Sequence, residues 1–204
     1  MANTLTKKRL AWAFGLLVAL FAAVVATVWM LNVRGETPVT RVAPVAVPAS
    51  PAQIERGKYL AQAGNCISCH TVRGGPAYAG GRGIDTPFGA VYAPNLTPHA
   101  ETGMGTWSPD HFWRAMHHGR SKDGRLLYPA FPYTEYTHVT REDSDAIFAY
   151  LQSLPPVAQP NHAHTLRFPY NSQWALAVWR ALYFTHGEKN KNQNQSADWN
   201  RGAY

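Results

Sequence analysis

Cysteine is scarce in this chain of 204 residues, with Cys66 and Cys69 the two present. A disulfide between cysteines this close would link no distant segments, so they do not form a disulfide framework. A zinc site needs four ligands, usually including a second cysteine or histidine pair at close spacing, and no second cysteine pair exists. A thioredoxin-like dithiol is expected in a βαβ context, whereas short helical segments and Gly/Pro loops surround this pair.

Acidic residues and long runs of like charge are also few. The chain has 19 Lys+Arg and 12 Asp+Glu, a formal net charge of +7, and its longest basic run is Lys7-Lys8-Arg9. Positive charge spread this thinly does not indicate nucleic-acid binding. A basic surface suits anionic lipid or an acidic protein partner.

One long uncharged run, Leu10 to Leu31, follows the basic cluster. Its length of about 22 residues, or roughly 33 Å of helix, is enough to cross a bilayer core. A secretory signal usually has a shorter apolar core and then a small-residue cleavage site, which Val28-Trp29-Met30-Leu31 does not offer. We therefore expect residues 1–34 to be an uncleaved membrane anchor, with a cleaved signal as the alternative. The preceding positive charges place the rest of the chain on the exported side.

Three segments are expected after the anchor. Residues 35–52, rich in Pro, Val and Ala, predict a stiff tether. Residues 53–157 predict a compact domain, and residues 158–204 predict an extension with one helix and a polar tail. The expected helices run over Ile54–Ala61, Ser108–Gly119, Thr140–Ser153 and Ser172–Phe184. Asn171 is the expected cap of the last helix, which is apolar around most of its girth and should dock against protein. Long Gly/Pro-rich loops between short helices predict an all-α fold.

The sequence Cys66-Ile67-Ser68-Cys69-His70 is a c-type haem attachment motif. Two thiols add to the two vinyl groups on one edge of the porphyrin, and the adjacent imidazole then ligates the iron from one face. An export signal on the same chain agrees with this prediction, because cytochromes c mature outside the cytoplasm. We expect one covalent haem c.

Between Arg56 and Val157 the chain resembles the cytochrome c subunits of membrane-bound periplasmic dehydrogenases, such as those acting on alcohols, aldehydes, gluconate or nicotinate. The stretches that carry the resemblance are Arg56–Leu60, Asn65–Thr71, Thr86–Gly89, Tyr92–Pro98, Thr102–Ser108 and Leu127–Tyr133. The resemblance implies a class I cytochrome c-like domain in the periplasm, anchored in the bacterial inner membrane. It implies an electron-transfer subunit of the respiratory chain, without a substrate of its own. Electrons would pass from a dehydrogenase or another cytochrome toward quinone or a terminal oxidase.

The second axial ligand is an open question at the sequence level. The family often has Met in a Pro-Ala-Met-Pro-Tyr block, where this chain has Phe131, which cannot bind iron. Met116 is the preferred replacement, because it shares an apolar helix face with Phe112 and a thioether raises the reduction potential; its alternative role is core packing. The other candidates are Met104, His117 and His118. An iron without a sixth ligand is the remaining alternative, and it would suit peroxidase-like or small-ligand chemistry.

Further residues are expected around the haem. Asn95, with Tyr92 and Thr97, is expected to hydrogen-bond a propionate or an axial ligand, and Arg82 and Arg125 to pair with propionates. For each of these a turn or solvated residue is an equal alternative. We expect Phe131, within the segment Pro129–Tyr133, to form an apolar wall that excludes water from the iron. This wall, together with Cys66 and Ile67, is the expected docking face for the redox partner, and the helix Ser172–Phe184 is the expected partner-binding element.

A short internal repeat links the two ends of the exported part. Arg201-Gly202-Ala203-Tyr204 repeats the Arg-Gly-x-Tyr pattern of Arg56–Tyr59. In the resembling family this phrase opens the next haem domain of a three-haem subunit. We therefore expect the chain to correspond to the first haem domain of such a subunit, truncated or split from it, with a coincidental tail as the alternative.

Overall fold

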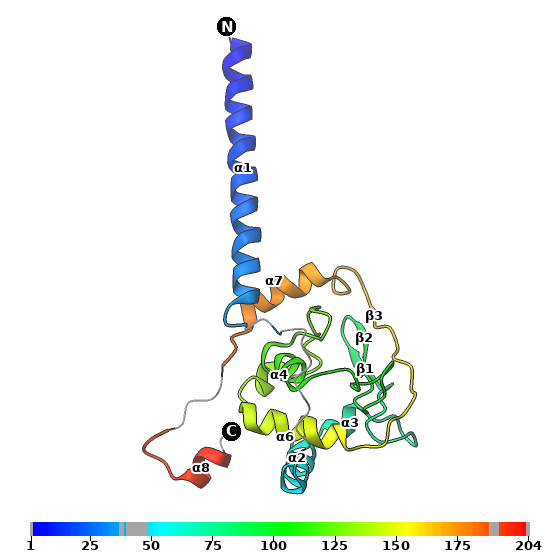
Figure 1. The fold of residues 1–204 in the computed structure, drawn as a ribbon. Helices are drawn as coiled ribbons and strands as arrows, with labels where there is room; N and C mark the ends of the chain where they lie inside the picture. Colours follow the sequence, from blue (N-terminus) through cyan, green and yellow to red (C-terminus); the bar gives the residue numbers. More distant parts are fainter. Residues whose placement is uncertain (1, 37–38, 40–48, 188–191, 203–204) are drawn as a thin grey trace.

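A computed structural model describes residues 2–36, 39, 49–187 and 192–202. Figure 1 shows a long helix, α1 (Ala2–Val33), standing out from a folded domain that holds most of the other elements. Residues Thr6–Val33 have a mean hydropathy of 2.5 and are long and apolar enough to cross a membrane. This finding supports the expected membrane anchor. Most of the predicted tether, residues 37–38 and 40–48, lies outside the described residues.

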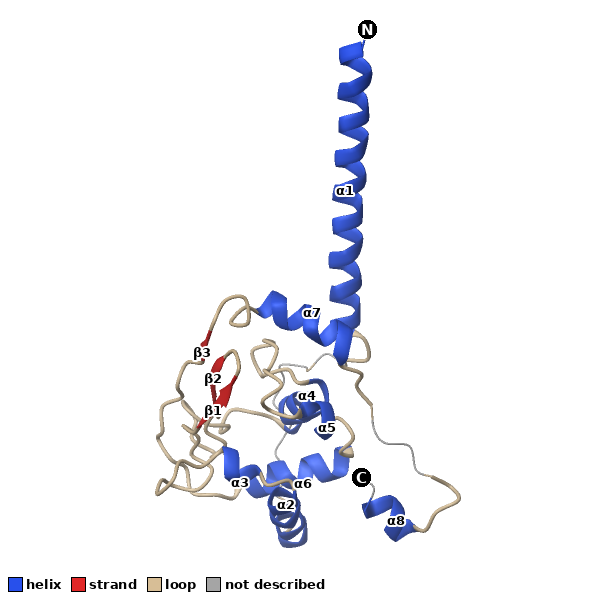
Figure 2. Cartoon of the chain, turned by 180° about the vertical axis from the view of Figure 1, so that it is seen from behind, coloured by secondary structure: helices blue, strands red, loops and turns tan. Residues whose placement is uncertain are grey.

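Five helices of the described residues form the body of the domain, and Figure 2 shows them in blue. They are α2 (Pro51–Ala63), α3 (Cys66–Cys69), α4 (Pro109–His118), α5 (Tyr133–Tyr136) and α6 (Arg141–Gln152). The expected helices near Ile54, Ser108 and Thr140 are confirmed. The first begins three residues before its predicted start, because Ser50 caps it and Pro51 supplies a preset first-turn φ angle.

The predicted caps of α4 and α6 are present. The Ser108 hydroxyl accepts from the His111 amide, and His111 Nδ1 accepts from the Ser108 amide. The two bonds form a capping box. The Thr140 hydroxyl accepts from the Asp143 amide at 3.3 Å. Both caps satisfy helix N–H groups that have no partner inside the helix, so the local sequence fixes where each helix starts.

Helices α2 and α6 pack against each other closely. A Cβ placed on Gly57 would lie 1.8 Å from the Ala146 carbonyl oxygen, so only glycine allows this approach. Next to it, Arg56 Nε donates to Asp143 Oδ1 at 2.8 Å, and the Asp143 side chain is fully buried. The Arg-Gly pair of α2 therefore has a packing role.

A small antiparallel sheet corrects the all-α expectation. Its strands β1 (Gly83–Thr86), β2 (Gly89–Tyr92) and β3 (Thr165–Leu166) lie in the order β1-β2-β3. The hairpin falls in the Gly/Pro-rich stretch expected to be irregular, where four-residue strands leave too little alternation to detect. Strand β3 pairs with Gly89 and Ala90 of β2, and so ties the extension to the domain.

Two helices follow β3: α7 (Gln173–Tyr183) and α8 (Ala197–Gly202). Ser172, not the expected Asn171, is the N-cap residue of α7. In Figures 1 and 2, α7 runs across the foot of α1, while α8 stands away from the domain. The α1–α7 contact includes hydrogen bonds from Asn32 Nδ2 to the Ala177 carbonyl and from Arg180 Nε to Asn32 Oδ1, both 2.9 Å.

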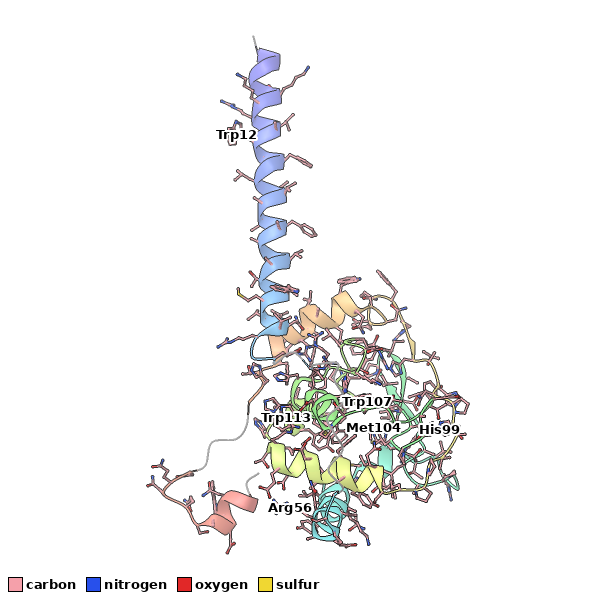
Figure 3. All side chains as sticks on the ribbon, in the orientation of Figure 1. Trp12, Arg56, His99, Met104, Trp107 and Trp113 are labelled. Carbon is pink, nitrogen blue, oxygen red and sulfur yellow. The ribbon has the colours of Figure 1, made fainter. Side chains whose placement is uncertain are left out.

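The hydrophobic core lies between α2, α4 and α6. Its buried members are Ala61, Tyr78, Met104, Phe112, Met116, Ile147, Phe148 and Leu151. Figure 3 labels Met104 and Trp107 inside the folded domain, whereas Trp12 projects from the isolated part of α1. This core forms one side of the cavity described next.

Candidate haem site

A cavity of about 1010 Å³ opens beside the core and contains the attachment motif in its wall. Cys66, Cys69 and His70 line it on one side, and Leu127, Ala130 and Phe131 belong to the same lining. The volume is at the upper end of the roughly 300–1,000 Å³ typical of small-molecule and cofactor sites. The structure thus brings the sequence-predicted attachment residues to one large, mostly apolar cavity.

The motif residues have the chemistry that haem attachment requires. Cys66 and Cys69 are the two ends of α3, and both are free thiols rather than a disulfide. Burial raises the pKa of Cys66 to about 11, which keeps it a thiol until it reacts. Asn65, before α3, adopts a left-handed conformation with φ of 52°, which asparagine tolerates better than most residues and which starts the short helix.

His70 is oriented by a backbone carbonyl. Its Nδ1 lies 2.8 Å from the Pro94 oxygen, and a carbonyl can only accept, so Nδ1 carries the proton. The other nitrogen, Nε2, then keeps its lone pair for a metal. Burial lowers the pKa of His70, which favours the neutral ring that iron needs. The residues present therefore fit a haem held by two thioethers and one imidazole.

Helix α5 and the turn before it close the cavity from a second side. Tyr136 donates its hydroxyl proton to the Gly64 carbonyl at 2.7 Å, joining α5 to the residues just before the motif. Phe131 is half-buried in the cavity wall, with its ring centroid 5.5 Å from that of Tyr136. The expected apolar wall is present at Phe131. Tyr133, by contrast, is fully buried against Phe184 of the extension and does not belong to an exposed face.

The two candidate methionines occupy different places. Met104 lines the cavity, and its amide donates to the Thr97 carbonyl at 2.8 Å. It therefore belongs to the loop that also supplies the Pro94 oxygen bound by His70. Met116 is buried in the core on α4, outside the cavity lining, but next to Ala115 and one turn after Phe112, both of which line the cavity.

His117 and His118 are buried on α4 away from the cavity. His117 stacks on Trp113 with ring centroids 4.3 Å apart, and His118 lies 5.0 Å from the ring of His186. Burial lowers the pKa of both rings, that of His118 to about 3. The structure does not bring either ring to the cavity with His70.

Asn95 lines the cavity, but its side chain is already engaged. Its Nδ2 donates to the Val157 carbonyl at 2.8 Å and to Thr102 Oγ1 at 3.1 Å. Its Oδ1 accepts from both the amide and the hydroxyl of Thr97. These contacts shape the loop after Pro94 and fasten it to the end of the domain. Arg125 also lines the cavity, exposed and paired with Asp123, whereas Arg82 donates to the Ser68 carbonyl.

Two histidines of the extension, His162 and His164, also line the cavity. His164 Nδ1 accepts from the Tyr92 amide at 3.1 Å, so in the neutral ring the proton sits on Nε2. That tautomer does not offer Nε2 to iron. The contact spans 72 residues and follows from the pairing of β3 with β2, so no local pattern could have revealed it.

Comparison with known proteins agrees with this geometry. The family model for cytochrome c matches residues 54–155, which is half of the chain and contains every residue of the attachment motif. The matched range begins inside α2 and ends just after α6, so it coincides with the helical body that encloses the cavity.

Several dehydrogenase subunits are similar over a longer range. A nicotinate dehydrogenase subunit of Pseudomonas putida is 46% identical over 202 residues, covering 97% of this chain and 17% of that protein. The gluconate 2-dehydrogenase cytochrome c subunit of Pantoea cypripedii is 44% identical over 136 residues, 66% of this chain and 31% of its own length.

The fructose dehydrogenase cytochrome subunit of Gluconobacter japonicus is 37% identical over 164 residues, 79% of this chain and 34% of its own length. The chain therefore spans less than half the length of each of these relatives. Taken with the cavity, the free thiols and the oriented imidazole, the match shows that this chain belongs to the cytochrome c family and is homologous to the cytochrome subunits of dehydrogenases.

Proposed function

We propose that the chain is a mono-haem c-type cytochrome unit that carries electrons from a periplasmic dehydrogenase, or from another cytochrome, toward quinone or a terminal oxidase. The observation that carries this proposal is the placing of Cys66, Cys69 and His70 in the wall of one cavity, with His70 Nδ1 held by the Pro94 carbonyl. The similarity to dehydrogenase cytochrome subunits supports the class of partner.

The proposed roles follow from the geometry. The two thiols hold the haem covalently, His70 orients it by ligating the iron, and the iron supplies a one-electron couple. The Phe131 wall excludes water from the ring, which favours the less charged reduced state and raises the potential. Lys122 and Arg125 are basic residues of the cavity lining; Lys122 donates to Thr106 and Arg125 pairs with Asp123, so each would exchange that partner to bind a propionate.

A redox titration of the purified membrane protein tests the proposal. The covalent haem should titrate as a single one-electron couple, and the reduced protein should be oxidised by a quinone analogue or by a cytochrome acceptor. A protein that retains its haem through denaturing electrophoresis but exchanges no electrons with any donor dehydrogenase or acceptor would contradict the proposed function.

For the second axial ligand we propose Met116. A second ligand would have to reach the iron from the side opposite His70. Met104 belongs to the loop whose Pro94 oxygen holds His70, with its backbone amide bonded to the Thr97 carbonyl, whereas Met116 comes from a separate element, α4. Both methionines belong to the core cluster against which Phe131 packs; Met116 lies on α4, on the face that also carries Phe112. Since Met side chains are flexible, a change of rotamer beside Ala115 is the movement that ligation requires.

Two matched variants test the assignment. Met116→Leu should abolish the thioether-to-iron charge-transfer band and lower the reduction potential, whereas Met104→Leu should retain the band. The reverse pattern would assign the ligand to Met104. A band that survives both substitutions would exclude a thioether from either position.

One observation favours a second candidate function. Phe131 stands in the wall where a ligand is common in the family, and no other residue of the described cavity wall from Leu127 to Tyr136 can bind iron through a thioether or imidazole. An iron open on that side would bind small ligands or peroxide. Fast carbon monoxide binding to the reduced wild-type protein, with a high-spin spectrum, would support this function over electron transfer.

We further propose that α1 stays in the bacterial inner membrane with the haem domain in the periplasm, and that the chain corresponds to the first haem domain of a three-haem subunit. The coverage of less than half of each relative and the repeated Arg-Gly pattern support this proposal. The proposed docking face for the redox partner comprises Cys66, Ile67, Pro129 and Phe131.

A reporter fusion tests the proposed membrane topology. A periplasmic reporter enzyme fused after Tyr204 would be active if the topology is right and silent if the chain faces the cytoplasm.

A further inference from the structure

The outer face of α7 is apolar and uncovered in the described structure. Trp174, Val178 and Leu182 follow each other at four-residue intervals and are 59%, 40% and 68% exposed. On a helix this spacing puts the three side chains on one face. An exposed stripe of this kind marks an interaction site.

The opposite face of α7 is attached to the folded domain. Leu176 and Arg180 are buried there, and the Arg180 guanidinium donates to the His118 carbonyl. The Gln173 side chain makes two further bonds to the backbone of Leu126, at 2.7 and 3.2 Å. The stripe therefore points away from the domain, which explains why the helix is apolar around most of its girth.

The contacts with α1 fix the position of α7 along the α1 axis, at the C-terminal end of α1. Asn32, in the last turn of α1, donates to the Ala177 carbonyl and accepts from Arg180 Nε, both at 2.9 Å. Figure 1 shows α7 crossing the foot of α1, with the domain on the other side. If α1 spans the bilayer, as proposed above, then the stripe of α7 faces the surface from which α1 emerges.

Aromatic residues are gathered at this same level. Trp29 in α1 is 67% exposed. Phe168 and Tyr170 precede α7 and Tyr183 is its last residue; all three are exposed, although Tyr170 also stacks on Phe88. Tryptophan and tyrosine concentrate where a protein crosses from lipid to water. An amphipathic helix with such residues lies in the plane of the interface, with its apolar face roughly 5–10 Å into the headgroup and acyl boundary.

We infer that α7 is a second membrane contact: a helix lying in the bilayer interface, with Trp174, Val178 and Leu182 in contact with lipid. The inference rests on the proposed membrane span of α1. Together the two helices hold the haem domain against the membrane at two places.

Spin labels on the haem-loaded full chain in phosphatidylcholine–phosphatidylglycerol vesicles test this inference. Both native thiols are consumed by haem, so Val178→Cys or Leu182→Cys gives one labelling site. Phe14→Cys reports the span, and Tyr59→Cys, an exposed aromatic position on α2, is the aqueous control. The readout is the ratio of nitroxide relaxation by oxygen, which partitions into lipid, to relaxation by a water-soluble nickel chelate.

The ratio at positions 178 and 182 should exceed that at position 59 by about fivefold or more and fall below that at position 14, as an interfacial depth requires. Ratios equal to that at position 59, with a high ratio at position 14, would overturn the α7 contact and leave the span intact. Low ratios at all four positions would overturn the span as well. Labels shielded from both reagents would overturn the lipid contact in favour of a second copy of the chain.

Discussion

The two cysteines differ from every other residue in what their loss would do. Cys66→Ser or Cys69→Ser should leave the haem attached by one thioether, and the haemochrome absorption band should move to longer wavelength because one vinyl group stays unsaturated. The double variant should lose haem in denaturing electrophoresis. Covalent haem retained by the double variant would contradict the attachment assignment.

Arg56, whose side chain is 44% exposed, pairs with the fully buried carboxylate of Asp143 between α2 and α6. Arg56→Ala should lower the free energy of unfolding by about 3 kcal/mol, because a carboxylate without solvent exposure loses its charged partner. Arg141→Ala is the matched control: Arg141 is as exposed as Arg56, but its partners Asp110 and Asp145 keep 42% and 30% of their side chains exposed, so its loss should cost about 1 kcal/mol or less. Chemical denaturation measures both, and equal losses would contradict the burial argument.

Residue chemistry was the most predictable level. The attachment motif specifies its own function, because thiol, thiol and imidazole at this spacing suit one cofactor. The polar residues were less predictable. Asn95 was expected either to hydrogen-bond the haem or to be a turn residue. It lines the cavity, and its side chain bonds Thr97 and Val157, so it satisfies the backbone and side-chain groups of its own loop.

At the scale of elements, the contact of α2 with α6 makes a sharp prediction at Gly57. Alanine is normally better than glycine in a helix by about 1 kcal/mol. Here Gly57→Ala should instead lower the melting temperature, because its Cβ would meet the Ala146 carbonyl at 1.8 Å, and backbone cannot move aside cheaply. Tyr59→Ala, exposed on the same helix, should change stability little. A stabilised Gly57→Ala protein would show that the helices are not this close.

The predictability of elements followed their length and caps. Helices α4 and α6 were predicted because Ser108 and Thr140 are recognisable N-cap residues. The β1–β2 hairpin was not, because its strands are four residues long and rich in glycine. The extension contributes His164 to the cavity wall, where its ring accepts from the Tyr92 amide. This contact depends on strand pairing across more than 70 residues, which no local sequence pattern encodes.

At the scale of the whole molecule, a buried polar network joins the anchor to the domain. Asn32 binds Ala177 and Arg180, and Arg120 donates to the Asn32 carbonyl at 3.0 Å and to Glu36 at 2.8 Å. Removing a partner from such a network costs about 1–3 kcal/mol per group left unsatisfied. The network makes the junction rigid.

This rigidity is measurable as haem orientation. In aligned membranes the wild-type haem should show one sharp angle by linear dichroism, and Asn32→Ala combined with Arg180→Met should broaden it. Lys58→Ala, which removes an exposed charge paired with Glu55 outside the cavity lining, is the control and should leave the angle unchanged. A wild-type haem without preferred orientation would refute the rigid junction.

The rigid junction between α1 and the haem domain affects how often the haem meets its redox partner. A haem on a swivelling tether must search three-dimensional space and all orientations before it meets its partner. A haem whose height and facing are set by Asn32 and Arg180 searches only across the plane of the membrane. Partners confined to the same plane would then meet it at a high effective concentration, so few surface charges would be needed to steer them. A search confined to the membrane plane is therefore compatible with the diffuse charge of this chain.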